Sequence, residues 1–118
     1  MRLVQHRGCL LKSARSIVPG EPLWKIAPTH DENGIYLCDF MVLIPKLKSR
    51  SGAYIQHAQS HIAGVLAQHS EVVFANLDMQ LNILWISHHF RVGLMVEIIS
   101  AIRQQVPEAV LVAHNARG

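Results

Sequence analysis

The chain has 118 residues, half of them apolar, with 11 Lys or Arg against 8 Asp or Glu and a formal net charge of +3. This length predicts one domain that buries a core without help from disulfides or metals. We expect no membrane partner, because no apolar run approaches the roughly 18 residues of a membrane span. Two cysteines are too few for a disulfide framework, which favours a reducing, cytoplasmic location.

The N-terminal part of the chain carries the positive charge. Residues 1–50 hold eight Lys or Arg against four acids, whereas residues 51–118 hold three against four. We interpret residues 1–34 as a basic, partly irregular extension, because prolines and glycines interrupt it. Short strands are expected at most at residues 3–4 and 23–26. Residues 35–118 then form the folded domain.

The first half of this domain reads as a strand followed by a helix. Residues 35–44 are apolar at both alternating sets of positions and end at Pro45, which predicts a strand buried on both faces. Apolar residues at helical spacing then predict a helix over residues 52–69. Ser49 and Ser51 are the candidate caps of this helix.

The second half reads as two strands, a helix and a closing strand. The apolar runs at residues 71–77 and 81–87 predict a hairpin with its turn near Asp78. The spacing over residues 93–106 predicts an amphipathic helix that Gly93 caps and Pro107 stops. Residues 109–113 form the closing strand.

This order of elements predicts an α+β protein with a ferredoxin-like βαββαβ sandwich, in which an antiparallel sheet carries two helices on one face. The second face of the sheet would then lack a helix, although its strands are apolar on both sides. We therefore expect a homodimer that buries this face. Coverage by residues 1–34 is the alternative.

Two segments resemble known families. The sequence Val92-Gly93-Leu94-Met95 resembles the strand-to-helix glycine junction of ACT domains, where a helix N-terminus receives an amino acid. Residues 101–114 resemble the closing helix and strand of NapD-type chaperones, which bind the twin-arginine signal peptide of periplasmic nitrate reductase. These resemblances imply a small regulatory or binding domain.

The candidate ligand site lies at the start of the second predicted helix. Arg91 stands beside Gly93, where free backbone N–H groups favour an anion such as a carboxylate or phosphate. His88 and His89 follow the preceding strand, and His114 ends the last one. Adjacent strand residues point to opposite faces, so at most one of the pair His88 and His89 joins His114.

The sequence predicts no metal, no cofactor and no catalytic residue. His57 and His61 are four residues apart on a helix, but a third ligand and the HExxH and CxxC motifs are absent, so we expect two solvated histidines. His69 falls on the apolar face at the helix end, where the expected role is capping or interaction with the negative end of the helix dipole. Asp39 lies among apolar strand residues, where a raised pKa would suit a general acid or base.

These observations favour a non-catalytic binding or regulatory module that recognises a small anionic ligand or a peptide. The alternative is a small enzyme of the dimeric α/β-barrel type, with Asp39 and a histidine in a pocket between helices and sheet. An assembly chaperone would instead need a sheet edge that accepts an extended peptide. An RNA-recognition module is not favoured, because residues 81–87 lack Lys, Arg and Gly.

Overall fold

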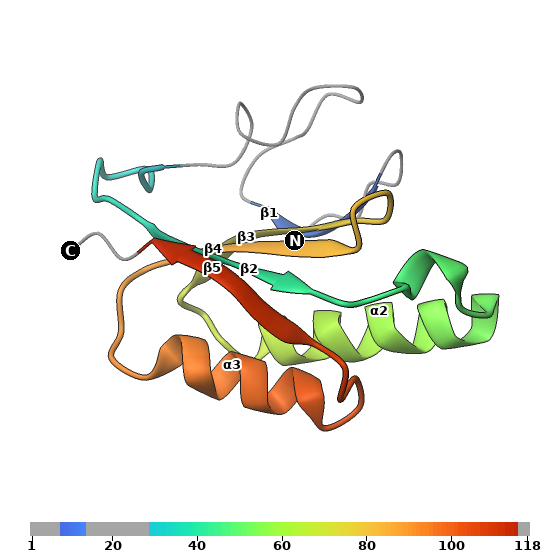
Figure 1. The fold of residues 1–118 in the computed structure, drawn as a ribbon. Coiled ribbons are helices and arrows are strands. Elements are labelled where there is room, and N and C mark those ends of the chain that lie inside the picture. The colour runs from blue at the N-terminus through green and yellow to red at the C-terminus, as the bar shows by residue number, and fades with distance from the viewer. Residues whose placement is uncertain (1–7, 14–28, 116–118) are drawn as a thin grey trace.

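The computed structural model describes residues 8–13 and 29–115. In this part of the chain, five strands form one sheet, and two α-helices cover one of its faces (Figure 1). The predicted α+β class is therefore confirmed. The elements are β1 (Gly8–Ser13), β2 (Cys38–Leu43), the 3-10 helix η1 (Leu47–Ser49), α2 (Gly52–Ala67), β3 (Val72–Asp78), β4 (Ile83–His88), α3 (Leu94–Arg103) and β5 (Val110–Asn115).

The strands lie in the order β1-β3-β4-β2-β5, and each pair of neighbours is antiparallel. Together with two helices on one face, this sheet is compatible with a ferredoxin-like fold. The elements predicted between residues 35 and 113 are all present, with ends that differ by a few residues. They differ most at the first strand, which begins at Cys38, and at the second helix, which ends at Arg103.

Strand β1 was not singled out in the sequence. It lies within the segment interpreted as an extension, yet it pairs with β3 along the edge of the same sheet. A short polar-flanked run such as Gly8–Ser13 carries little periodicity of its own, and the partner strand supplies its backbone hydrogen bonds. The short strands predicted at residues 3–4 and 23–26 lie outside the described residues.

Each of the two α-helices begins at a residue that suits a helix N-terminus. The side chain of Ser51 caps α2 by accepting a hydrogen bond from the Tyr54 backbone N–H at 3.1 Å. Gly93 precedes α3 with φ of 83°, a left-handed conformation that glycine adopts without strain. The helix ends before Val106, because the residue before Pro107 is disfavoured in the α region.

The hydrophobic core fills the layer between the two helices and the sheet. Strand β2 shows the alternation clearly, since Phe40 and Val42 are buried against the helices while Met41 points to the other face. The helices contribute their apolar stripes to the same cluster. Core residues with essentially no exposed surface include Val42, Ile44, Leu47, Ala58, Ile62, Leu66, Leu77, Leu84, Ile86, Leu94, Ile98 and Ile102.

The sheet face without a helix, called here the open face, is mixed in burial. Phe74 and Asn76 on β3 are buried within the single chain. Met41 and Trp85, which are cross-strand partners on β2 and β4, are only half-buried. The open face is therefore shielded from solvent at β3, as expected. Its part formed by β2 and β4 is partly exposed to solvent.

Candidate functional site

Gly93 stands at the junction of β4 and α3, as predicted. An added Cβ at Gly93 would meet no atom within 4 Å, so its backbone conformation, rather than crowding, requires glycine here. No side chain caps the N-terminus of α3. Its first turn instead contains Glu97, whose negative charge interacts favourably with the positive end of the helix dipole.

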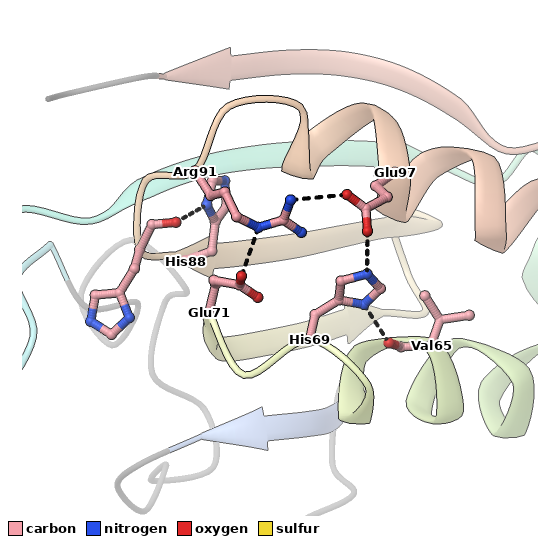
Figure 2. Close-up of polar contacts among 7 residues, drawn as sticks. Val65, His69, Glu71, His88, Arg91 and Glu97 are labelled. Carbon is pink, nitrogen blue, oxygen red and sulfur yellow. Dashed lines mark hydrogen bonds and ion pairs between the residues drawn. The ribbon is translucent and has the colours of Figure 1, made fainter.

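Arg91 is engaged by two carboxylates (Figure 2). Its Nε donates to Oε2 of Glu71 at 2.7 Å, and its Nη1 lies 3.0 Å from Oε2 of Glu97. Arg91 therefore joins the start of β3 to the first turn of α3. A small anion at this helix N-terminus would compete with both carboxylates for the guanidinium.

The same contacts set the ionisation of the three groups. The hydrogen bond from Arg91 holds the pKa of Glu97 below its usual value. The pKa of Glu71 is also lowered, first by a hydrogen bond from its own backbone N–H and then by Arg91. The hydrogen bonds to Glu97 and Glu71 in turn raise the pKa of Arg91. All three groups are therefore charged at neutral pH.

His69 connects this group to the end of α2. Its Nδ1 donates to the Val65 carbonyl oxygen at 2.8 Å, which confirms the predicted capping role. Its Nε2 lies 3.6 Å from Oε1 of Glu97 (Figure 2). His69, Glu71, Arg91 and Glu97, called here the Arg91 cluster, thus tie together the end of α2 and the starts of β3 and α3.

The neighbouring histidines are held by bonds of their own. His88 is buried, donates from Nδ1 to the His89 carbonyl oxygen at 2.8 Å and meets the Phe40 ring edge-on. His89 places Nε2 2.9 Å from Oδ2 of Asp31. The two rings therefore diverge, as expected for adjacent residues. His114 lies opposite Phe40 in the β5 register, and its side chain is outside the described part of the structure.

The turn that begins at Asp31 is linked to the end of β4 through His89, a contact that the sequence did not predict. Oδ1 of Asp31 accepts the backbone N–H groups of Asn33 and Ile35, at 2.8 and 2.9 Å. The Ile35 N–H is the main cause of the lowered pKa of Asp31, and the bond from His89 adds to it. The sequence signals the local Asx turn, whereas the partner 58 residues away carries no local signal.

A second polar group was missed by the sequence analysis. The Tyr54 hydroxyl donates to Oε2 of Glu108, and the Arg50 guanidinium lies 3.1 Å from the same oxygen. Arg50 also lies over the Tyr54 ring, 3.8 Å from its centroid, a cation–π geometry. Burial, followed by the Glu108 carboxylate, raises the pKa of Tyr54. This group fastens the start of α2 to the segment before β5.

The two spaced histidines of α2 contact α3. Nε2 of His61 donates to the Ala101 carbonyl oxygen at 2.8 Å, and Nε2 of His57 lies 3.1 Å from Oε1 of Gln105. The expectation of a solvated pair is therefore wrong for His61, because this face of α2 lies against α3. Among the described residues, no group of three or more His, Cys, Asp or Glu could hold a metal ion.

Asp39 lies on the open face of the sheet. It alternates with Phe40, which is buried on the helix side, and its cross-strand partners are Ser87 on β4 and Asn115 on β5. The space between helices and sheet is occupied by the hydrophobic core. Asp39 thus does not lie in that layer, where the enzyme alternative had placed it.

Comparison with known proteins adds no assignment. No family model, no curated protein and no solved structure matches this chain. The resemblances to ACT domains and NapD-type chaperones therefore rest on the quoted residues alone. None of the helices in the described ranges is long and apolar enough to cross a membrane.

The Arg91 cluster and Asp31 predict a pH dependence of stability. Because Asp31, Glu71 and Glu97 have lowered pKa values in the folded state, they stabilise it fully above their unfolded pKa values of about 4. Protonation removes this stabilisation as the pH falls further. We expect the urea concentration at the midpoint of unfolding to decrease as the pH is lowered from 5 to about 3. The variant Arg91→Gln should flatten this dependence, whereas Lys46→Gln, at an exposed loop position, should leave it unchanged.

Proposed function

We propose that the chain is a non-catalytic peptide-binding module that takes an extended peptide as an added strand on β5. The observation that carries this proposal is the state of the β5 edge. In the described sheet, β5 pairs only with β2, and its residues Val110 and Val112 are 46% and 52% exposed. An edge strand offers unpaired backbone donors and acceptors, and neighbouring apolar side chains supply contact area.

A peptide is favoured over the small anion because of the charges around Arg91. The guanidinium already contacts Glu71 and Glu97, so the net charge of the three groups is −1. An anion binding at Gly93 would first have to displace one of these carboxylates. The β5 edge requires no such displacement, since its outer hydrogen-bonding groups face no described strand.

The proposal is tested with a phage-displayed library of random dodecapeptides selected against the full chain. Peptides recovered from the selection are synthesised, and their affinity is measured by fluorescence anisotropy. We expect Val110→Lys to reduce affinity at least tenfold, because a lysine on an edge strand opposes strand addition. The control Leu81→Lys replaces another exposed apolar residue, on the β3–β4 turn, and should leave affinity unchanged.

Backbone pairing is tested separately through the peptide. In a strand added to an edge, alternate N–H groups of the peptide face the sheet and the others face away. N-methylation of one alternate set should abolish binding, and methylation of the other set should preserve it. Equal tolerance of both sets, or equal effects of Val110→Lys and Leu81→Lys, would contradict strand addition at β5.

We further propose that β2 to β5 with α2 and α3 form a ferredoxin-like βαββαβ unit to which β1 is added. Its open face is proposed to be the interface of a homodimer in the cytoplasm. This is supported by the half-buried apolar side chains of Met41, Leu43, Ile83 and Trp85, which neighbour one another in the β2–β4 register.

The dimer predicts a concentration-dependent molar mass. Light scattering on the full chain should give twice the monomer mass of 13.2 kDa. The variant Met41→Glu should give the monomer, because it places a charge in an apolar interface. Val92→Glu, at an exposed loop position away from the open face, should remain dimeric. A wild-type chain that is monomeric at all concentrations would refute the dimer.

A further inference from the structure

Arg103 differs from the other arginines whose side chains the structure describes. Arg50 pairs with Glu108, and Arg91 pairs with two glutamates. Arg103 is exposed and forms no ion pair with a described acid. Its Nε donates to the Ala109 carbonyl oxygen at 2.7 Å, just before β5 begins. Because guanidinium has five N–H donors, this bond leaves others available to a ligand.

The helical spacing places Arg103 on the flank of α3 that points away from α2. Glu97 and Ala101 mark the flank facing α2, since they contact His69 and His61 respectively. Successive residues of an α-helix are rotated by about 100° around its axis, so Val96 and Arg103 project in nearly the same direction. That direction differs by more than about 90° from the directions of Glu97 and Ala101. Val96 is also exposed.

This flank borders the β5 edge of the sheet. Helix α2 contacts β1, which forms the opposite edge. Figure 1 shows α3 lying beneath β5. Val96 and Arg103 therefore flank the side of the molecule on which a strand added to β5 would lie. Arg103 stands near the beginning of β5, as its bond to Ala109 requires.

We infer that Arg103 selects a carboxylate side chain in the peptide bound along β5, an inference that rests on the proposed function. An added strand places every second side chain over α3. One such side chain meets Val96 and another meets Arg103. A guanidinium recognises a carboxylate through two parallel hydrogen bonds, which gives geometric selectivity as well as attraction.

The helix also sets the spacing of the two recognised residues. Val96 and Arg103 are seven residues apart, or about 10 Å along the axis of α3. Side chains on one face of a strand repeat about every 6.7 Å. The acidic residue of the peptide therefore lies two or four positions from the apolar residue that contacts Val96.

The test uses the peptides recovered from the dodecapeptide library. We expect Asp or Glu to be enriched two or four positions from an apolar residue. In a recovered peptide, replacing that acid by Lys should weaken binding to the full chain by at least fivefold, and replacing it by Asn should weaken it less. The Asp-over-Lys preference should shrink at 0.5 M salt, because charge interactions at a surface are screened.

Protein variants then assign the preference to a residue. Arg103→Gln should remove the Asp-over-Lys preference while binding of the Asn peptide stays within twofold. Arg103→Lys should restore most of the preference. Arg50→Gln, which changes an arginine at the start of α2, should leave it intact. Peptides that bind at β5 without an acid preference overturn the role of Arg103 alone. Failure of the library to yield any peptide sensitive to Val110→Lys overturns the proposed function and this inference together.

Discussion

Replacing Phe40 by Ala is expected to lower the free energy of unfolding by about 3–5 kcal/mol. Phe40 is 1% exposed, lies on β2 between the strands β4 and β5, and belongs to the core cluster between sheet and helices. The substitution forfeits the free energy gained by burying the ring. It also leaves a cavity that cannot fully collapse, because β2 is held between β4 and β5. It also removes the ring that meets His88 edge-on.

Urea unfolding followed by far-ultraviolet circular dichroism measures this change. The control is Phe90→Ala, because Phe90 is 61% exposed on the loop after β4. Its change should stay within about 0.5 kcal/mol. If the two variants were destabilised equally, Phe40 would not occupy the core position assigned to it, and the facing of β2 would have to be reversed.

That facing could not be predicted from β2 alone. Residues 35–44 are apolar at both alternating sets, so the pattern indicated a strand without indicating its inner face. Burial against the helices selects Phe40 and Val42, and the open face receives Asp39 and Met41. Helix α3, in contrast, was predictable in position and facing, because its apolar residues form one stripe with polar residues opposite.

The polar contacts were the least predictable part of the molecule. Arg91 was correctly expected beside the start of α3, but its partner Glu71 is 20 residues away and carries no local signal. The same holds for the bond from His89 to Asp31. Which charged residues pair in this way depends on which strand ends lie next to each other. The pairs follow from strand order, which periodicity alone does not specify.

Alanine at Gly93 and alanine at Gly64 are expected to change the free energy of unfolding in opposite directions. Gly93→Ala should lower the free energy of unfolding by about 1–2 kcal/mol, because φ of 83° is unfavourable for any residue with a Cβ. Gly64→Ala should raise it by about 0.5–1 kcal/mol, because Gly64 is exposed within α2 and alanine has the higher helix propensity. An added Cβ has no neighbour within 4 Å at either position. Steric clashes therefore do not contribute to the difference in unfolding free energy between the two variants.

Gly93→Ala also separates a structural role of this glycine from a ligand-binding one. If Gly93 only sets the direction of the chain into α3, urea unfolding detects the loss of stability, and peptides selected on the wild-type chain still bind below the transition. If Gly93 receives a ligand by close backbone approach, affinity falls by more than the change in folded population explains. Because the peptide is proposed to lie along β5 and not at this junction, we expect the first result. Equal stability of Gly93→Ala and the wild type would show that the turn tolerates a Cβ.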